Sequence, residues 1–407
     1  MPQRSFAKCS FPRSVVSRRF HQVLTLVCLL TAAVLAQAQH ESVLYNFTGG
    51  LDGSGPTSLI RDPSTGVLYG TAFIGGCGGA GTVYKVTPTG TLTVIHCFAD
   101  QSSGGGVPAS GLVQDSAGTL YGTTSEGGGF ETCTSFGCGA VFKVNPNPPY
   151  HYTVLHRFTG LPHDGMVPNA IMIDSAGNLF GTAGGGAFAS GIMFKIDTSG
   201  TFSVLYTFTG GADGSQPQQG LVEDAAGNFY GFTKSGGSFN AGVIFKIRGT
   251  KETVLYNFTG GPDGGFVQGY DGHPILDSAG NLYGATTWGG IVNRTCPEGC
   301  GVIFRLSPSG VYTGLHSFTG GGDGSAPNSG LLRAASGVIY GTSYSVAFKL
   351  TPSGSPTVLH NFVGGTTDGL APNGGLLMDG SGSLYGSTFR GGTGCCDGVG
   401  VIFKIYK

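Results

Sequence analysis

Short apolar runs of four to seven residues alternate with polar segments through residues 42–405, and this alternation predicts β-strands. The runs are rich in Val, Ile, Leu, Phe and Tyr. The segments between them, such as D-S-A-G-N at 174–178 and T-P-S-G at 351–354, fit tight hairpin turns. Asp and Asn bond nearby backbone in such turns, Pro sets φ, and Gly adopts positive φ. We therefore predict strands joined by turns throughout.

Three motifs recur in fixed order, seven times each. V-[LI]-[YH]-x-F ends at Phe47, Phe98, Phe158, Phe208, Phe258, Phe318 and Phe362. L-Y-G, or a close variant, has its aromatic residue at Tyr69, Tyr121, Phe180, Tyr230, Tyr283, Tyr340 and Tyr385. V-F-K-V, or a similar run, has its aromatic residue at Tyr84, Phe142, Phe194, Phe245, Phe304, Phe348 and Phe403. A fourth apolar segment precedes L-Y-G, so each unit supplies four strands.

Seven units of roughly 50 residues with four strands each predict an all-β fold, a seven-bladed β-propeller. We name the strands of a blade A to D from the centre outward. Residues 39–407 would form this single domain. The first predicted strand, 43–47, is a D strand and the last, 401–405, a C strand, so the last blade is closed by the N-terminal strand. The alternative, an open solenoid, would need capping units at its ends.

Residues 1–38 are typical of a secretory signal peptide. Five basic residues and no acidic residue precede or flank an apolar run from Val23 to Ala36, and Ala36-Gln37-Ala38 fits a cleavage site. The run is shorter than the about 20 residues of a membrane-spanning helix. We expect export to the periplasm, cell surface or medium, with no membrane span in the mature chain.

Composition narrows the class of protein further. Charged residues make up 11 % and hydrophobic residues 40 %, which excludes a disordered polyelectrolyte. The formal net charge is -1, and the sequence contains no stripe of basic residues. We therefore expect no nucleic-acid partner. We expect a monomer.

The motifs F-T-G-G-x-D-G, G-L-x-x-D-x-x-G-N-L-Y-G-T-T and G-V-I-F-K-L together resemble the GloVer tandem repeat of exported bacterial proteins. The resemblance covers residues 42–405. It implies a repeat architecture and export, and it implies no established catalytic residue.

In a propeller of this register, the D-to-A and B-to-C connections share one rim, which we call the loop-rich rim. The A-to-B and C-to-D hairpins form the opposite rim, the hairpin rim. Variable loops on a rigid scaffold commonly bind ligands. The D-to-A connections carry an Asp-Gly pair at Asp52, Asp164, Asp213, Asp263, Asp323 and Asp368. These carboxylates could bind Ca²⁺, although Asp-Gly is also a common turn sequence; no other cofactor is predicted.

One connection departs from the repeat and is the best local candidate for ligand binding. Q-G-Y-D-G-H-P at 268–274 replaces the usual segment before an A strand. Aromatic faces with polar edges suit sugars, and the candidate set is Tyr270, Asp271, His273, Trp288, Arg294 and Glu298. Four other histidines, His96, His156, His316 and His360, share one repeat position with Tyr and are expected to pack.

Eight cysteines follow the predicted signal peptide, and an even number in an exported protein favours disulfides. Cys133 and Cys138 share one B-to-C loop, and Cys296 and Cys300 share another. Cys77 and Cys97 are expected near the same rim of one blade, which leaves Cys395 and Cys396 for a vicinal bridge. A four-cysteine zinc site would require distant blades to converge.

These observations favour an exported binding propeller without an evident catalytic motif. It would recognise polysaccharide or a surface protein through the loop-rich rim. The alternative is a secreted carbohydrate-active hydrolase or lyase, although no pair of carboxylates stands out as the acid and base that a glycosidase needs.

Overall fold

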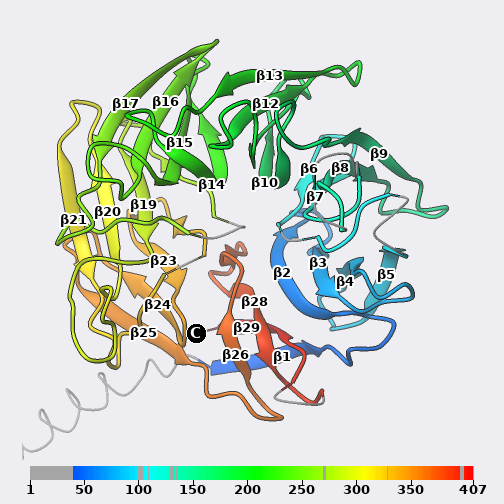
Figure 1. The fold of residues 1–407 in the computed structure, drawn as a ribbon. Helices are drawn as coiled ribbons and strands as arrows, with labels where there is room; N and C mark the ends of the chain where they lie inside the picture. The colour runs from blue at the N-terminus through cyan, green and yellow to red at the C-terminus, as the bar shows by residue number, and fades with distance from the viewer. Residues whose placement is uncertain are drawn as a thin grey trace, which may run out of the picture. The chain divides into compact units, whose positions relative to one another are not determined.

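Seven four-stranded sheets make up the chain in a computed structural model (Figure 1). The model describes residues 40–99, 104–108, 110–128, 133, 136–268, 272–327, 329–394 and 398–406. The regular elements in these ranges are all β-strands. The predicted signal peptide and the candidate residues Tyr270, Asp271, Cys395 and Cys396 lie outside the described residues.

The seven sheets are the predicted blades, and their strands follow the chain from the centre outward (Figure 1). The inner A strands are β2 (Ser54–Arg61), β6 (Val113–Gln114), β10 (Met166–Ile173), β14 (Ser215–Glu223), β18 (Ile275–Leu276), β22 (Leu332–Arg333), and β26 (Gly369–Pro372) with β27 (Leu377–Met378). The B strands are β3 (Leu68–Ile74), β7 (Leu120–Thr124), β11 (Leu179–Gly184), β15 (Phe229–Ser235), β19 (Leu282–Thr286), β23 (Ile339–Thr342) and β28 (Leu384–Gly391).

The two outer positions of each blade are equally regular. The C strands are β4 (Thr82–Val86), β8 (Ala140–Val144), β12 (Ile192–Ile196), β16 (Val243–Arg248), β20 (Val302–Leu306), β24 (Val346–Leu350) and β29 (Val401–Tyr406). The outer D strands are β5 (Leu92–Cys97), β9 (Tyr152–Arg157), β13 (Phe202–Thr207), β17 (Lys251–Asn257), β21 (Tyr312–Ser317), β25 (Pro356–Asn361) and β1 (His40–Asn46). We number the blades 1 to 7 from β2, so that β1 belongs to blade 7.

This arrangement confirms the predicted seven-bladed propeller and its closure. The N-terminal strand β1 pairs with β29, next to it in Figure 1, and the backbone N–H of Phe47 donates to the carbonyl of Gly400 at 3.1 Å. Between the B strand of blade 7 and the A strand of blade 1, the Ser387 hydroxyl donates to the carbonyl of Thr57 at 2.6 Å. The ring is therefore closed by backbone and side-chain bonds, which leaves no open sheet edge at this point.

The inner strands differ from the uniform runs that the sequence predicts. Their described lengths range from two residues in β6 to nine in β14. Pairing of the longer inner strands with their neighbours is interrupted by register shifts near Pro56, Pro168 and Gln218. Proline has no N–H to donate, so a strand that contains it pairs incompletely.

Backbone bonds between neighbouring blades replace part of this missing pairing. The residue that leads into the inner strand has positive φ, as in Val107 (54°), Val167 (49°) and Gln216 (54°). Its N–H donates to a carbonyl in the B-to-C loop of the preceding blade, for example from Val167 to Cys138 at 2.8 Å. The same bond from Gly55 to Val399, also 2.8 Å, joins blade 1 to blade 7.

Aromatic side chains from the D and C strands fill the space between blades. Phe258 and Phe304 are fully buried, and their ring centroids are 5.4 Å apart. The glycine of the L-Y-G motif lies against the C-strand ring: a Cβ on Gly231 would be 2.4 Å from Cζ of Phe245. The motif therefore keeps glycine because the core aromatic residue occupies the space of a side chain.

Candidate functional site

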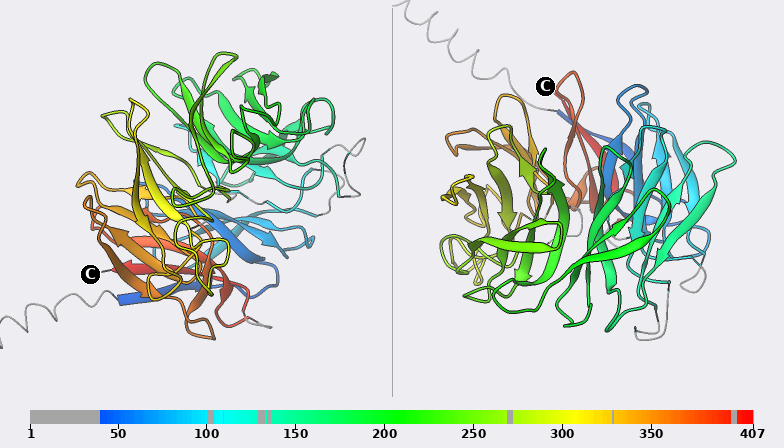
Figure 2. Two further views of the ribbon diagram at one scale, coloured as in Figure 1. Left: turned by 60° about the vertical axis from the view of Figure 1, so that its left-hand side comes forward. Right: turned by 90° about the horizontal axis from the view of Figure 1, so that it is seen from above.

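On the hairpin rim, the A-to-B turn of most blades is built around one carboxylate, and Figure 2 shows the strands running between the two rims. In the turn of blade 3, Asp174 Oδ1 accepts the N–H groups of Ala176 and Asn178 at 2.9 and 2.8 Å. Its Oδ2 accepts the amide of Asn178 at 2.7 Å. Four further turns are organised by aspartates that accept the equivalent backbone bonds, Asp115, Asp224, Asp277 and Asp379. These carboxylates are engaged in folding their own turns.

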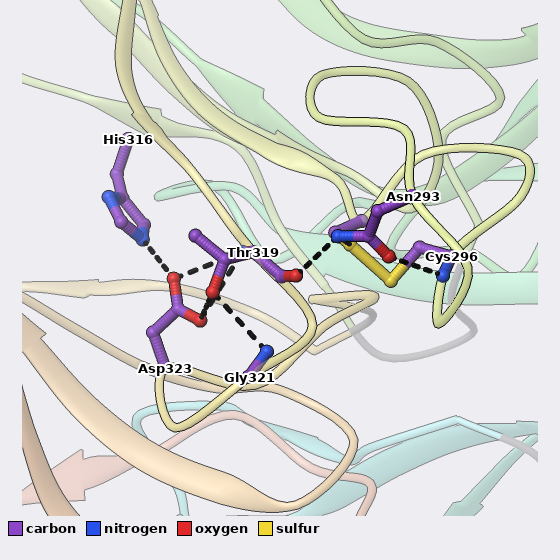
Figure 3. Close-up of polar contacts among 7 residues, drawn as sticks. Asn293, Cys296, His316, Thr319, Gly321 and Asp323 are labelled. Carbon is purple, nitrogen blue, oxygen red and sulfur yellow. Dashed lines mark hydrogen bonds and ion pairs between the residues drawn. A yellow bond between two sulfur atoms is a disulfide. The ribbon is translucent and has the colours of Figure 1, made fainter.

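The loop-rich rim repeats a second carboxylate turn, shown for blade 6 in Figure 3. His316 Nε2 is 3.2 Å from Oδ2 of Asp323, and the Thr319 hydroxyl donates to Oδ1. The backbone N–H of Thr319 also donates to Asp323, at 3.1 Å. The same turn, with Tyr or His as the first partner and Thr as the second, forms around Asp52, Asp164, Asp213 and Asp263.

These turns decide what the predicted Asp-Gly carboxylates can do. Five of the six accept a Thr hydroxyl from their own connection and contact a Tyr or His side chain of the D strand before it, as expected of a structural turn. In the part of the chain that the structure describes, one group of three ligating side chains is close enough to share an ion. That group contains Asp368 but none of the other five. A calcium site at the remaining positions would have to displace the bonds of the turn.

Asp368 departs from the other five in its surroundings. Val363 stands where the other copies have Thr, so the carboxylate receives a backbone N–H from Val363 at 2.8 Å but no hydroxyl. His360 Nε2 lies 3.1 Å from Oδ1, which also accepts the N–H of Gly369 at 2.7 Å. Glu41, from the closing strand β1, completes the group: one ligand atom from each of Glu41, His360 and Asp368 lies within 4.8 Å of the others.

In three of the seven blades, the position that Glu41 occupies carries a ring that stacks on the preceding blade. Counting six residues back from the repeat Phe gives Tyr152, Phe202 and Tyr312, which stack on His96, His156 and Tyr256. Glu41 and Glu252 replace this ring in two blades, and each has a buried Oε1 without a hydrogen-bond partner. Burial raises the pKa of both carboxyl groups; that of Glu252 rises to about 7, with Asp213 contributing, while His360 partly offsets the rise at Glu41.

The four histidines at the repeat position share packing but differ in polar contacts. His96 stacks on Tyr152 with 3.9 Å between ring centroids, and burial lowers its pKa to about 4. The other three histidines, His156, His316 and His360, each contact an aspartate. The sequence predicted packing for all four and missed the His–Asp contacts; the only signal was the alternation of Tyr and His opposite a recurring Asp.

The candidate ligand set around 268–274 is spread over several environments. His273 lies between the inner strands of blades 4 and 5, where Nδ1 is 3.2 Å from the carbonyl of Leu221. Burial lowers its pKa, and its ring covers Gly220, where a Cβ would be 2.0 Å from the ring. Trp288 instead packs on Phe266, with ring centroids 5.3 Å apart. The structure therefore holds His273 in an inter-blade contact.

Arg294 and Glu298 of that set are exposed in the B-to-C loop of blade 5. The loop is held by the Cys296–Cys300 disulfide and by the Asn293 amide, which donates to the carbonyl of Thr319 at 2.7 Å (Figure 3). Disulfides also join Cys133 to Cys138 and Cys77 to Cys97. All three pairs were predicted from the sequence, and they stiffen the connections of the loop-rich rim.

Exposed apolar side chains gather on the loop-rich rim. In blades 1 to 6 the end of the B strand or the B-to-C loop presents at least one: Ile74, Phe136, Phe188, Phe239, Ile291 with Val292, and Tyr344. Leu51 and Val363 add two more from D-to-A connections. Of the large exposed hydrophobic residues in the described ranges, Val311 is the one on a turn of the hairpin rim. Apolar groups that remain in water along one face indicate an interaction surface.

Both rims carry cavities of several hundred cubic ångströms, including one of about 460 Å³ on the loop-rich rim that is lined by Phe73, Ile74 and Glu126. A cavity of about 390 Å³ on the hairpin rim is lined by turn residues such as Asp224, Ser278 and Pro308. On the loop-rich rim, a cavity of about 380 Å³ between blades 3 and 4 is lined by Met166 and Val167 together with the amide side chains of Gln216 and Gln218. Apolar and amide groups in one cavity suit a ligand with both kinds of surface.

The chain belongs to the Gloeobacter/Verrucomicrobia repeat family. The family model matches residues 33–224 and 132–346, which together span most of the chain. A search of curated proteins found no match. The family assignment confirms the resemblance seen in the repeated motifs.

Similar solved structures share the propeller architecture at low sequence identity. A streptogramin B lyase is 13 % identical with a TM-score of 0.59, over 91 % of this chain and 99 % of the lyase. The virginiamycin B lyase of Staphylococcus aureus is 13 % identical with a TM-score of 0.56, over the same shares. PorZ, a surface component of the type-IX secretion system of Porphyromonas gingivalis, is 16 % identical with a TM-score of 0.51, over 88 % of this chain and 47 % of PorZ. At these identities the likeness concerns the fold.

Within the described residues, no helix has the length and apolar character needed to cross a bilayer.

Proposed function

We propose that this protein is an exported binding propeller that recognises polysaccharide through its loop-rich rim. The observation that carries the proposal is the series of exposed apolar side chains on the B-to-C connections of six consecutive blades. Four of these residues are aromatic, Phe136, Phe188, Phe239 and Tyr344, and the three phenylalanines lie in successive blades. Aromatic faces stack on the apolar faces of sugar rings, while amides and hydroxyls bond the ring edges.

Two further features support a binding role on this rim. The disulfides and the turn carboxylates hold its loops in place, so that little conformational entropy is lost when a ligand binds. The cavity lined by Gln216, Gln218 and Met166 lies between blades 3 and 4, which also present Phe188 and Phe239. Export is supported by the three disulfides, which persist in oxidising compartments.

Binding to immobilised polysaccharides and to a glycan array tests this proposal. A variant with Phe188→Ser, Phe239→Ser and Tyr344→Ser should lose most of its glycan binding, because each change removes an exposed stacking surface. The matched control is Val311→Ser on the hairpin rim, which removes an equally exposed apolar side chain and should bind as the wild type does.

Three outcomes would contradict the proposal. The wild type could bind no glycan, the triple variant could bind unchanged, or the wild type could capture a surface protein and no sugar. The hydrolase or lyase alternative predicts that saccharide products accumulate when the protein is incubated with its polysaccharide. Chromatography of the supernatant separates that outcome from binding.

A further inference from the structure

A site of mixed nitrogen and oxygen ligands lies where the closing strand meets blade 6. It is formed by Glu41 on β1, His360 on β25 and Asp368 in the connection that follows β25. The Asp368 side chain is 9 % exposed and that of His360 is 22 % exposed. Oε1 of Glu41 is buried and has no hydrogen-bond partner. Two carboxylates and one imidazole therefore lie close together in a partly buried position.

The molecule contains its own comparisons for this site. At His156–Asp164 and His316–Asp323 the imidazole and the carboxylate are present, but Phe202 stacks on the first histidine and no glutamate joins either pair. At Glu252 the buried carboxylate is present, but its neighbours are Tyr206 and Asp213, so no imidazole is available. Only the group at Glu41 has all three ligands, as judged over the described part of the chain.

Asp368 differs from its counterparts in the group that takes the place of the Thr hydroxyl. In the five other turns the second partner of the aspartate is a Thr hydroxyl, and Val363 cannot supply one. The backbone N–H of Gly369 donates to Oδ1 of Asp368 instead, at 2.7 Å, and this carboxylate lies beside Glu41, whose Oε1 has no hydrogen-bond partner. Two anions this close repel each other in a medium of low polarity, and a cation between them removes that cost.

From this geometry we infer that Glu41, His360 and Asp368 bind one divalent transition-metal ion of the zinc type. One imidazole nitrogen and two carboxylate oxygens match the ligands of zinc, whereas calcium prefers six to eight oxygen ligands. His360 Nε2 and Asp368 Oδ1 are 3.1 Å apart. Two ligands of one tetrahedral zinc ion are about 3.4 Å apart, so a small outward movement would admit the ion in place of the hydrogen bond.

The site would link the first strand of the described chain to the end of blade 6. Glu41 belongs to the strand that completes blade 7, whereas His360 and Asp368 belong to the preceding blade and its connection. A bound ion therefore crosslinks two blades beside the point of ring closure. An ion that binds the folded state alone raises the melting temperature with its concentration.

Titration of the chelator-treated protein with Zn²⁺ and with Co²⁺ tests the inference. Calorimetry should show one Zn²⁺ per chain, and Co²⁺ should give visible absorption bands of a low-coordinate site with nitrogen and oxygen ligands. Excess Zn²⁺ should raise the melting temperature by about 3 °C or more. The absence of any bound equivalent in the wild type would overturn the inference without use of a variant.

Variants of the three ligands locate the ion. The equivalent positions of other blades show which replacement residues fit. Glu41→Phe copies the contact of Phe202 with His156, and His360→Tyr copies the contact of Tyr206 with Asp213, so both should fold. Each should weaken Zn²⁺ binding at least about 100-fold, because a ligand is lost. Circular dichroism and melting curves without metal confirm folding.

Control variants should keep the full affinity for Zn²⁺. These are His316→Tyr and Glu252→Phe, which change the two comparison sites, and His40→Gln, which removes the exposed histidine next to Glu41. Loss of binding in His40→Gln with retention in Glu41→Phe would assign the ion to His40 and overturn the inference. Retention of binding in His360→Tyr would do the same.

Discussion

Both rims of the propeller contain turns folded by an aspartate, but the two rims differ in the loops that accompany these turns. On both, an aspartate accepts backbone and side-chain hydrogen bonds that fold a short connection, as Asp277 does on the hairpin rim and Asp213 on the loop-rich rim. The hairpin rim repeats its aspartate turn around Asp115, Asp174, Asp224, Asp277 and Asp379. The loop-rich rim adds long B-to-C loops, three disulfides and most of the exposed apolar side chains of the described residues. The long loops and the disulfides therefore lie on the rim where five aspartate turns hold the D-to-A connections.

The difference shows how a repeat can hold a fold constant while a surface changes. A residue that folds its own connection recurs in most blades, as the aspartates of the A-to-B turns do. A residue that faces solvent on a B-to-C loop is not tied to the core, and Phe136, Phe188, Phe239 and Tyr344 occupy loops of different sequence. Departures from the repeat, such as Val363 and Glu41, thus mark places with a separate role.

Acid should weaken both rims and gives the largest expected effect. Burial alone would raise the pKa of the turn aspartates, but hydrogen bonds outweigh it and lower the pKa of Asp164, Asp174, Asp224, Asp277 and Asp379. Their stabilisation is present above the unfolded pKa of about 3.9 and is lost as pH falls through the lower folded values. After allowance for solvent screening, the free energy of unfolding should fall by roughly 3–5 kcal/mol between pH 5 and 2.

Urea unfolding at pH 5, 4, 3 and 2 measures this loss. A free energy of unfolding that stays constant over that range would show that the carboxylates do not hold the turns.

Removal of one carboxylate from each rim tests whether the turns are equivalent. Asp277→Ala removes the carboxylate that accepts hydrogen bonds from Ala279, Asn281 and Tyr283. Asp213→Ala removes the carboxylate that accepts hydrogen bonds from Tyr206 and Thr209. Each should cost about 2–3 kcal/mol, because several partly buried donors lose their partner.

Thermal and urea unfolding of the two variants provide the comparison, with Ser278→Ala, at an exposed position of the same turn, as the control. A cost below about 0.5 kcal/mol for Asp213→Ala alone would mean that the loop-rich carboxylates are not structural. They would then be available to a ligand.

Glu252 offers a smaller, pH-dependent test away from the turns. Burial, with Asp213 nearby, raises the pKa of Glu252 to about 7, so its charged form disfavours the folded state. Stability should therefore decrease as pH rises from about 4.5 to 7. Glu252→Gln removes that decrease and should raise the free energy of unfolding at pH 8 by about 1 kcal/mol, since the group is only half-buried.

Melting curves of wild type and Glu252→Gln at pH 5 and pH 8 check this expectation. Equal differences between the two proteins at both pH values would show that Glu252 does not titrate in this range. Glu223→Gln, at another carboxyl group whose pKa burial raises, serves as a comparison.

The exposed loop side chains should matter least for stability. Phe188→Ser and Phe239→Ser replace side chains that are 59 % and 60 % exposed. The free energy of unfolding should change by less than about 0.5 kcal/mol in each variant. A larger loss in urea unfolding would mean that these rings support the fold, and it would remove the basis for assigning them to ligand binding.

The fold was predictable because each blade needs the same residues at the same places. The L-Y-G glycine faces a C-strand ring, and the repeat Phe fills the space between blades, so the count of motifs gives the count of blades. The start on a D strand and the end on a C strand predicted the pairing of β1 with β29. The cysteine pairs were predictable because each lies within one loop or one blade.

The candidate site was less predictable because neighbours in sequence need not face the same way. His273 turns into the contact between blades 4 and 5, where Gly220 leaves room for its ring, while Arg294 and Glu298 face solvent. Glu41 and His360 meet only through ring closure and the packing of successive D strands. The available signal was the replacement of an aromatic residue by Glu at 41 and of Thr by Val at 363.

Closure by strands from opposite ends of the chain has a consequence for the order of folding. Ser387 and Thr57, which bond across the junction, are 330 residues apart. During synthesis, blades 1 to 6 can assemble one after another, but blade 7 waits for β29, and the loop-closure entropy of nearly the whole ring is lost in that one step. A circular permutant that begins at β2 and carries β1 after β29 would turn this last long-range encounter into a local hairpin, and it should refold faster.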